Sequence, residues 1–387
     1  MMDDVLAEEW QILSDLLPEN WRELSKTTRA LRRARGVKDP DTLLRLILLH
    51  CAGGLSLRST VARAKAQGLA TITDVALMQR LKRSRLWLES LTTSMLRSRQ
   101  RRIELPSLKK YRLRAIDATT VEEPGATGTS WRVHYSLTLP SLTCDFFEVT
   151  DKHGGETLKR FAIEANDLIL CDRAYGHREA VAGVMEAGGQ VIVRLTTGNF
   201  PLLTRRRAKF PLLGSMRSLK GHHPKSWPVL FEVEEKEQGQ EKEGGKTKLL
   251  QARLCAVRKS ATAAARARRK FLQEASKKQK RVGKVALELT KYVFVLTTVP
   301  EKILDATEIL ELYRCRWQVE LAFKRLKSLL QLGHLPKYDD ESARAWLQAK
   351  LLTALMIEKL AQNAELLSPW GFALSTNESL ADLPRSP

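Results

Sequence analysis

The sequence has 387 residues, and its 65 Lys+Arg outnumber its 44 Asp+Glu to give a formal net charge of +21. With 43% hydrophobic and 28% charged residues, this composition excludes wholesale disorder and is typical of two or three globular domains. No apolar run approaches the ~18 residues that a membrane-spanning helix needs, and the acidic start of the sequence is unlike a secretory signal. We therefore expect a cytoplasmic protein without a membrane partner.

The cysteines give no sign of a zinc site or a disulfide framework. There are five of them, an odd number, and they are scattered along the chain without Cys-x-x-Cys spacing. We expect all five to be reduced and mostly buried thiols. They are Cys51, Cys144, Cys171, Cys255 and Cys315.

The positive charge is clustered. Residues 266–284 hold nine Lys or Arg and a single acid, Glu274, and shorter basic clusters lie at 205–207 and 99–102. Any one cluster is explained as a solvated surface, but three clusters in a chain of charge +21 favour a polyanionic partner. Composition alone does not separate DNA from RNA or an anionic membrane.

Residues 1–108 read as a helical domain, punctuated by glycine and proline. Within it, residues 57–67 and 75–91 predict two helices joined by a turn, and the leucines of the second helix share one face. Lys82 and Arg83 lie on the opposite face, where they would contact DNA. An ordinary helical bundle with a basic, solvated side explains this pattern equally well.

Residues 109–195 change to a pattern of strands and helices. Three strands linked like hairpins are followed by strands that alternate with helices, which predicts a mixed sheet covered by helices. The expected strands are 111–121, 131–139, 144–150, 167–172 and 190–195, and the expected helices are 156–164 and 177–187.

Residues 196–305 interrupt this pattern with a β-containing insertion. Its expected strands are 227–233, 249–257 and 292–298. Two long helices, 306–330 and 340–360, come next, and the sequence ends in what reads as a loose tail, 363–387. The fold class expected is α/β, with an all-α N-terminal domain before the sheet.

Two expected strands end in an aspartate, Asp117 and Asp172. In sheets covered by helices, ligands bind beyond the strand ends, so both residues are well placed for chemistry. Each one alone is also explained as a turn or helix cap.

The helix expected over 306–330 carries the most specific pattern. At ~100° per residue, Tyr313, Arg316, Glu320 and Lys327 share an arc of about 60° that borders the apolar side of the helix. A salt-bridged amphipathic helix is the plain alternative. If Glu320 meets Asp117 and Asp172, the three carboxylates repel one another unless cations lie between them, and hard oxygen ligands suit Mg²⁺ or Mn²⁺.

These residues resemble the IS-four family of bacterial insertion-sequence transposases, which belong to the DDE superfamily. The family signature is Tyr, two residues, Arg, three residues, Glu, six residues, Lys, and Tyr313, Arg316, Glu320 and Lys327 match it without a gap. Ile116-Asp117-Ala118-Thr119-Thr120 looks like the first aspartate motif, and Asp172-Arg173-Ala174-Tyr175-Gly176 looks like the second.

The resemblance implies an RNase H-like mixed sheet with flanking helices, interrupted by a β-rich insertion. It implies that Asp117, Asp172 and Glu320 are catalytic and bind two Mg²⁺ or Mn²⁺ ions, while Tyr313, Arg316 and Lys327 contact DNA near the element's terminus. It further implies cut-and-paste transposition by a homodimer that binds double-stranded DNA, both terminal inverted repeats and target. Some relatives stack a flipped base on an aromatic residue of the insertion; Tyr292 is the candidate here, and Trp227 competes for that role.

We therefore expect a helical DNA-binding domain at 1–108, a catalytic core at 109–195 and 306–362, an insertion subdomain at 196–305 and a tail at 363–387. The bacterial protein would be cytoplasmic and associated with the nucleoid. Two alternatives stay open. One is a DNA-binding, inactive transposase descendant, and the other is an RNase H-like metal-dependent nuclease without strand transfer.

Overall fold

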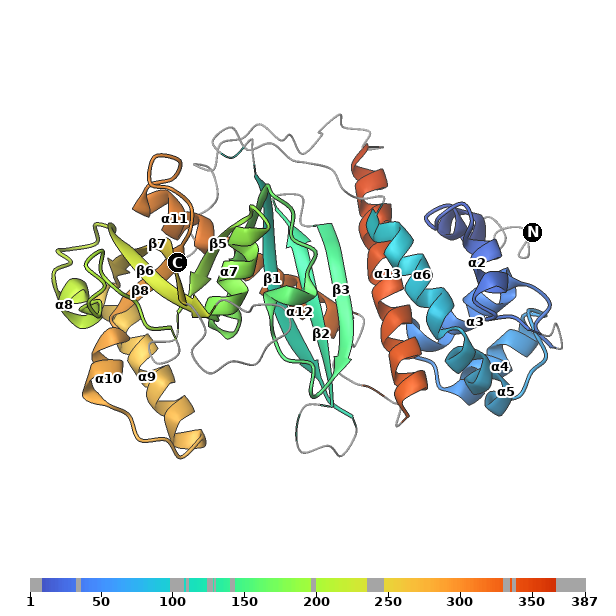
Figure 1. Ribbon diagram of the computed structural model, residues 1–387. Helices are drawn as coiled ribbons and strands as arrows, with labels where there is room; N and C mark the ends of the chain where they lie inside the picture. The colour runs from blue at the N-terminus through green and yellow to red at the C-terminus, as the bar shows by residue number, and fades with distance from the viewer. Residues whose placement is uncertain are drawn as a thin grey trace. The chain divides into compact units, whose positions relative to one another are not determined.

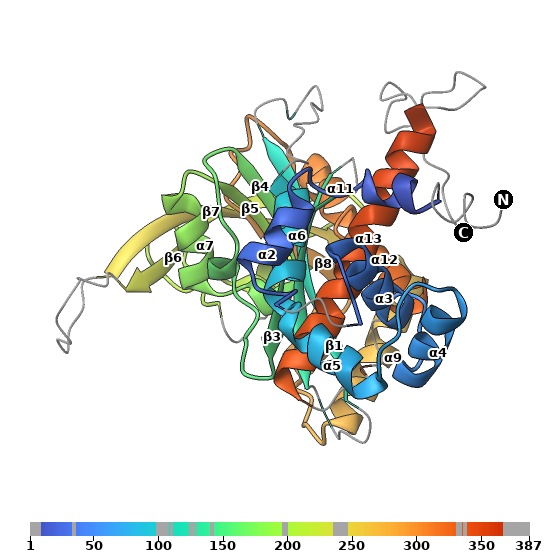
Figure 2. The same cartoon turned by 90° about the vertical axis from the view of Figure 1, so that its right-hand side faces the viewer.

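The computed structural model describes residues 9–32, 36–97, 108, 111–123, 128, 130–139, 143–195, 200–234, 247–329, 335 and 339–366. The contacts divide the chain into two compact units, which Figures 1 and 2 show from two sides. The helical unit comprises residues 1–100, 121–130 and 325–387, and the sheet unit comprises residues 101–120 and 131–324.

The helical unit includes α2 (Trp21–Thr27), α3 (Pro40–Cys51), α4 (Leu57–Ala66), α5 (Asp74–Arg83), α6 (Arg85–Arg97) and α13 (Asp340–Leu366). Side-chain caps fix where several of them begin, because the first N–H groups of a helix lack partners within it. The Asp39 carboxylate accepts from the Thr42 N–H at 2.7 Å, and Ser56 and Thr73 cap α4 and α5 in the same way. The last helix, α13, packs against α6, α5 and α3.

Two tryptophans form the centre of the helical unit. The rings of Trp21 and Trp87 are stacked with centroids 6.1 Å apart, and both side chains are fully buried. The Trp87 indole N–H donates to the Trp21 carbonyl at 2.9 Å, so its one polar group is satisfied.

The single helix expected over residues 75–91 is two helices, α5 and α6, which meet at Ser84. The buried Ser84 hydroxyl donates to the Arg80 carbonyl at 2.8 Å. Such bonds to the preceding turn bend helices, and here the chain changes direction at that residue.

One eight-stranded sheet forms the centre of the sheet unit. Its strands are β1 (Arg112–Val121), β2 (Trp131–Thr138), β3 (Thr143–Asp151), β4 (Asp167–Cys171), β5 (Gln190–Arg194), β6 (Lys225–Glu234), β7 (Thr247–Arg258) and β8 (Tyr292–Thr297). Their order across the sheet is β3-β2-β1-β4-β5-β8-β7-β6. The strands β1, β4 and β5 are parallel to one another. The antiparallel pairs are β2 with β3, β5 with β8, β8 with β7, and β7 with β6.

The mixed sheet predicted from the sequence is confirmed. The strands of the expected insertion, β6 to β8, extend the core sheet beyond β5 and share its hydrophobic core. The residues between β6 and β7, 235–246, lie outside the described part of the chain.

The sheet unit also contains helices, which cover the faces of the sheet or lie beyond its strand ends. They are α7 (Arg178–Glu186), α8 (Leu212–Arg217), α9 (Ala261–Lys277), α10 (Lys284–Leu289), α11 (Ala306–Arg314) and α12 (Trp317–Leu329), with short 3₁₀ turns at Leu158–Arg160 and Arg173–Tyr175. Figure 1 shows α7 in front of the sheet and α12 behind β1 and β2. The Phe323 ring of α12 lies 5.5 Å from that of Tyr135 on β2.

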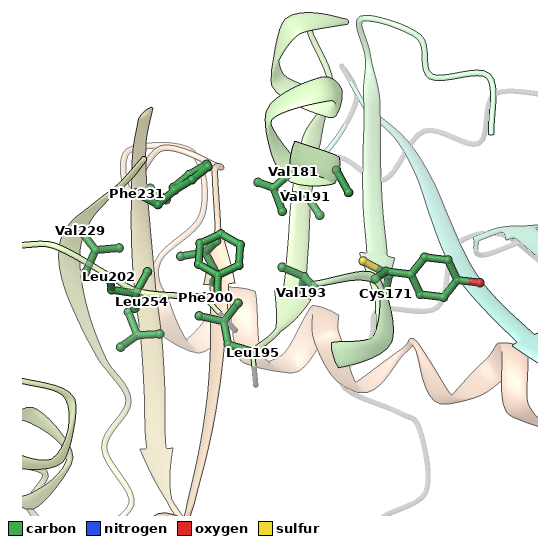
Figure 3. Packing of buried hydrophobic residues seen from close by; sticks show 14 of the residues in the cluster. Cys171, Val181, Val191, Val193, Leu195, Phe200, Leu202, Val229, Phe231 and Leu254 are labelled. Atoms are coloured by element: carbon green, nitrogen blue, oxygen red, sulfur yellow. The ribbon is translucent and has the colours of Figure 1, made fainter. Parts of the chain in front are cut away.

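The core beneath α7 joins the original sheet to its extension. Figure 3 shows Val181 of α7 beside Val191 of β5, with Phe200 and Phe231 further along the same layer. The two phenylalanine rings are 5.1 Å apart. Because these residues are buried together, β6 and β7 are stabilised by the same apolar layer as the parallel strands.

The helix expected over residues 156–164 is only the 3₁₀ turn Leu158–Arg160. The Arg160 side chain donates to the Gly155 carbonyl and to the Glu148 carboxylate, and the Glu164 N–H donates to Asp167. A helix continued over residues 156–164 would break these tertiary hydrogen bonds, so the segment stays extended outside the 3₁₀ turn.

Two further expectations concern chemistry and membranes. All five cysteines are free, four of them buried and Cys315 half-buried, as predicted.

Within the described part of the chain, every helix is too short or too polar to cross a lipid bilayer.

A buried ion-pair network fixes where β4 begins. Asp167 is fully buried and accepts from Arg112 at 2.6 and 2.9 Å and from Arg114 at 2.9 Å. Both arginines lie on β1, the neighbouring parallel strand. This network holds β1 and β4 in register, and that register determines what lies at their other ends.

Candidate active site

The register of β1 and β4 brings two aspartates to the same place on neighbouring strands. The ladder between β1 and β4 ends at the pair Ile116 and Cys171, so Asp117 and Asp172 each come one residue after it. Cys171 ends β4, and Asp172 is the first residue beyond. The strand-end position expected for Asp172 is thus confirmed, whereas Asp117 lies within β1, which continues to Val121.

The Asp117 carboxylate is mostly buried, with its side chain 18% exposed. The pKa of Asp117 is raised to about 6, chiefly by burial and also by the charges of Asp172 and Glu156, while the Ala118 N–H bond and Arg316 act to lower it. The electrostatic effect of Asp172 on Asp117 means that the two carboxylates repel each other across a short distance. A pair of oxygen ligands in this state favours a cation between them.

The helix expected over residues 306–330 is broken into α11 and α12. Four N–H groups around this break, from Cys315, Arg316, Gln318 and Val319, each bond to the carbonyl three residues earlier, which is the tighter 3₁₀ pattern. The uniform 100° per residue used to place the four signature residues therefore does not hold across this turn.

Arg316 lies at the turn and links two of the three acids. Its guanidinium is 3.3 Å from the Asp117 carboxylate and 2.6 Å from that of Glu320, with only 14% of its side chain exposed. Burial alone would lower the pKa of Arg316, but Tyr313, Glu320, Asp172 and Asp117 raise it above its ordinary value. The guanidinium is thus permanently charged.

Tyr313 lies against the same guanidinium, whose carbon is 5.8 Å from the ring centroid. The Tyr313 hydroxyl and the Arg316 Nε are both buried without a hydrogen-bond partner. Burial and the charge of Asp172 raise the pKa of Tyr313, so the hydroxyl keeps its proton and can donate it in a hydrogen bond. Two unsatisfied buried donors beside the acids are available to an anionic ligand.

Sequence reasoning missed a fourth carboxylate, Glu156. It lies after β3 and is half-buried, 3.5 Å from Arg132. Burial and the charge of Asp172 raise its pKa, while Arg132 lowers it. The sequence does place Glu156 shortly after a strand, as it does Asp172. Because we expected a helix over residues 156–164, Glu156 was not recognised as a candidate.

The donor chemistry of the acids fits a hard divalent cation. Asp117 and Asp172 supply oxygen ligands, and the charge of Asp172 already disfavours ionisation of Asp117. Among the described residues, no group of three Asp, Glu, His or Cys side chains is assembled to hold a metal ion. Glu320 is bonded to Arg316 in this structure, so it would exchange that partner to join the two aspartates at a metal.

The other sequence-predicted residues are more dispersed. Lys327 is exposed on α12, two turns after Glu320. In the helical unit, Arg83 is exposed, whereas Lys82 is half-buried and 3.1 Å from Asp339. Tyr292 is 7% exposed and belongs to the sheet's hydrophobic core, and Trp227 is half-buried beneath the Lys225 ammonium.

Comparison with known proteins agrees with this geometry. The family described as "Transposase DDE domain" matches residues 108–357, which is more than half of the chain. The chain belongs to this family of DDE transposases. The match includes both aspartates and the whole of the Tyr-Arg-Glu-Lys signature, and it confirms the family expected from those residues.

Curated relatives extend the similarity to most of the chain. The InsL protein of insertion sequence element IS186A from Escherichia coli K12 is 35% identical over 348 residues, covering 89% of this chain and 91% of InsL. The transposase of insertion sequence element IS421 from Escherichia coli is 35% identical over 349 residues, with the same coverage of both chains. Both are insertion-sequence proteins, as the resemblance implied.

A cryo-EM structure of the piggyBac transposase synaptic complex with hairpin DNA shares a fainter likeness. It has a TM-score of 0.45 and 8% sequence identity, covering 92% of this chain and 73% of that chain.

As a DDE transposase, the protein is an enzyme that acts on DNA and uses divalent metal. The mixed α/β core predicted as RNase H-like carries its acids on β1, after β4 and on α12.

Proposed function

We propose that this transposase binds the terminal inverted repeats of an insertion sequence, cleaves the phosphodiester at each end and joins the freed 3′-hydroxyl to target DNA. The observation that carries the proposal is the meeting of Asp117 with Asp172 on neighbouring strands, with Arg316 bonded to both Asp117 and Glu320. An acidic centre inside a chain of charge +21 suits a reaction on a polyanion.

The catalytic residues in this proposal are Asp117, Asp172 and Glu320, which would hold two Mg²⁺ or Mn²⁺ ions. When bound, two such ions activate the attacking oxygen and stabilise the leaving oxygen of a phosphodiester. The raised pKa of Asp117, about 6, reflects first its burial and then the nearby charges of Asp172 and Glu156, which leave its ionised form with a deficit of stabilisation. Cation binding would relieve that deficit.

Arg316 and Tyr313 would act on the DNA. When Glu320 turns to the metal, the Arg316 guanidinium loses that partner and keeps a fixed charge beside the acids, where a phosphate oxygen can accept from it. The buried Tyr313 hydroxyl would donate to the same phosphate. Lys327 would contact the backbone further along α12.

We further propose the division of labour expected from the sequence. Residues 1–108 would recognise the element's ends, with Lys82 and Arg83 among the contacts, and residues 109–195 and 306–362 would carry catalysis. Residues 196–305 would be the insertion, in which Tyr292 would reach a flipped base only if the start of β8 opened, because its ring is buried. The tail, 363–387, lies outside the described residues beyond Leu366. The enzyme would act as a dimer at the cytoplasmic nucleoid.

The test is incubation of the purified protein with linear DNA that carries its own element's ends, in Mg²⁺, Mn²⁺ or EDTA. The expected result is metal-dependent excision followed by joining to a second DNA, both lost in Asp172→Ala. Cleavage without joining would identify a nuclease that lacks strand transfer. Binding without any cleavage by the wild-type protein would identify an inactive transposase descendant.

A further inference from the structure

The helix α9 carries dense positive charge and contributes no buried side chain to the core. Its 17 residues include Arg266, Arg268, Arg269, Lys270 and Lys277, against one acid, Glu274. Helices in proteins are stabilised mainly by packing an apolar face, and α9 packs only half-buried residues such as Phe271. Core packing therefore does not explain why this helix carries these residues.

The basic residues form a stripe on the outer side. At ~100° per residue, Arg266, Arg269, Lys270 and Lys277 fall within an arc of about 100°, and all four are exposed. The half-buried residues lie on the other side; they are Ala264, Ala267, Phe271, Glu274 and Ala275. At ~1.5 Å per residue, the stripe extends about 16 Å from Arg266 to Lys277.

Like charges in this arrangement repel one another. Arg266 is followed by Arg269 and Lys270 at the spacings where helical side chains are neighbours, and like-charged pairs at these spacings destabilise a helix. The acid of α9, Glu274, borders the stripe and is 4.0 Å from Arg173, and one carboxylate does not offset four cations. A polyanion bound along the stripe would compensate it.

The position of α9 connects this stripe to the acids. Arg173, the residue that Glu274 faces, directly follows Asp172. The last residue of β5, Arg194, pairs with Val295 near the start of β8, and the last residue of β7, Arg258, pairs with Tyr292 at that start. The strands β5 and β7 therefore end at the same edge of the sheet. The helix α9 starts three residues after Arg258, and Figure 1 shows it beyond the ends of β7 and β8.

Further basic residues lie along this edge. Arg194 is exposed at the end of β5, and its charge lowers the pKa of Lys259 in addition to the effect of burial. The Lys259 ammonium donates to the Thr290 carbonyl at 2.8 Å, which holds the segment before α9 in place. Arg194 and Lys259 thus add positive charge between β5, the neighbour of β4, and the start of α9.

We propose that the stripe of α9, formed by Arg266, Arg269, Lys270 and Lys277, binds the phosphate backbone of the duplex whose scissile phosphodiester lies at Asp172. At 3.4 Å per nucleotide of one strand, the ~16 Å stripe follows about five phosphates. The surface presents cations without base-reading geometry, so it binds irrespective of sequence. This proposal rests on the proposed function, because it names the DNA of that reaction as its partner.

The test compares two double variants of the full chain. Arg266→Gln/Lys270→Gln removes two charges from the stripe, and glutamine keeps the helix propensity of these positions. Lys248→Gln/Lys302→Gln removes two exposed charges at the opposite edge of the sheet, at the start of β7 and after β8. Circular dichroism verifies that both variants fold.

Binding to an end duplex and to a duplex of unrelated sequence is measured by fluorescence anisotropy across a range of salt, in EDTA. The stripe variant is expected to reduce the slope of log affinity against log salt by about 1 to 2 on both duplexes, since each lost phosphate contact contributes roughly 0.9. The ratio of the two affinities should stay unchanged. The edge control should leave the slope as in the wild type.

Three outcomes would overturn the proposal: an unchanged slope in the stripe variant, an equal fall in both variants, or a fall confined to the end duplex. Methylphosphonate substitution near the cleavage position supplies a second measurement. Neutral linkages should weaken wild-type binding more than binding by the stripe variant, and equal weakening would exclude contact there. Because binding is measured without metal, failure of the excision test would remove the proposed function while leaving this result interpretable.

Discussion

The surroundings of Asp117 disfavour its ionised carboxylate unless a cation is bound beside it. Its pKa of about 6 exceeds the ordinary value because the group is buried and because Asp172 and Glu156 lie near it. Arg316, at 3.3 Å, only partly offsets these effects. The free protein at neutral pH therefore holds an ionised group that destabilises the fold.

We predict that Asp117→Asn stabilises the metal-free protein at pH 8. A raised folded-state pKa means that the folded chain binds more protons than the unfolded chain between pH ~4 and ~6, so wild-type stability falls as pH rises through that window. Above pH ~6, ionised Asp117 lowers the free energy of unfolding of the wild type by on the order of 3 kcal/mol. The variant gains less than this, because it also loses the ion pair with Arg316. Thermal unfolding in EDTA at pH 4 and pH 8 measures it. A variant less stable than wild type at pH 8 would contradict this view.

Glu320 differs from Asp117, because it is half-exposed and bonded to Arg316 at 2.6 Å. We predict that Glu320→Gln keeps binding to end DNA and abolishes cleavage, since the amide oxygen still accepts from Arg316 but carries no charge for a metal. Gel shift and cleavage assays measure the two properties separately. Glu311→Gln, an exposed change of equal charge on α11, should retain both. Equal loss of binding and cleavage in Glu320→Gln would mean that Glu320 is structural.

At the scale of the elements, the strands were predictable and one functional helix was not. Alternating or continuous apolar runs locate β1 to β8, because a residue's place in a sheet depends on local pattern and burial. No comparable pattern in the sequence indicates the turn at Cys315 and Arg316. This turn combines 3₁₀ hydrogen bonds with a contact from Arg316 to Asp117, 199 residues earlier.

The same limit applies to Glu156 and to the insertion. The effect of Asp172 on the pKa of Glu156 depends on a tertiary fold that the residues around Glu156 do not encode. The strands β6 to β8 were expected, but their pairing with β5 depends on an antiparallel match of Arg194 with Val295 that periodicity cannot specify. The signature residues were found because their spacing is itself a sequence property.

The buried pairing of Asp167 with Arg112 and Arg114 fixes the register that places Asp117 beside Asp172. We predict that Asp167→Asn costs about 3 kcal/mol, since it removes the buried charge that both arginines share and leaves Arg114 only Asp145 and Arg112 only Glu164 as acidic partners. The pKa of Asp167 is lowered by Arg112 and Arg114 despite burial, so the wild-type advantage is present above pH ~4 and lost as pH falls below it. Denaturant unfolding at pH 7 and pH 3 measures both effects.

A matched control for Asp167 lies in the same cluster. Glu164 is 57% exposed and contacts Arg112 at 3.1 Å, so Glu164→Gln should cost less than about 1 kcal/mol. Similar losses from both variants would show that burial is not what makes the Asp167 network important.

On α12, Lys327 is exposed and follows Glu320 by seven residues. We predict that Lys327→Ala lowers the slope of log affinity against log salt by about 0.9, the effect of one phosphate contact. Lys302→Ala, an exposed lysine in the turn after β8, serves as the control. An unchanged slope in Lys327→Ala would exclude direct contact between Lys327 and phosphate.

At the scale of the whole molecule, the charge of +21 and the acids of the candidate active site have complementary roles. The distributed cations supply sequence-independent affinity for DNA, which salt weakens. The acids provide no affinity until cations neutralise them. DNA binding and cleavage should therefore separate experimentally, with the first persisting in EDTA and the second requiring divalent metal.

Excision of an element requires cuts at two ends, and each chain carries one set of Asp117, Asp172 and Glu320. We therefore predict a dimer on paired ends, whose light-scattering mass is twice the 43.8 kDa chain plus two duplexes. Mixing equal amounts of wild type and Asp172→Ala before adding DNA should reduce two-ended excision to about a quarter, because random pairing leaves that share of dimers with two intact centres. A fall to only half, with monomer mass on paired ends, would indicate that each chain cuts independently.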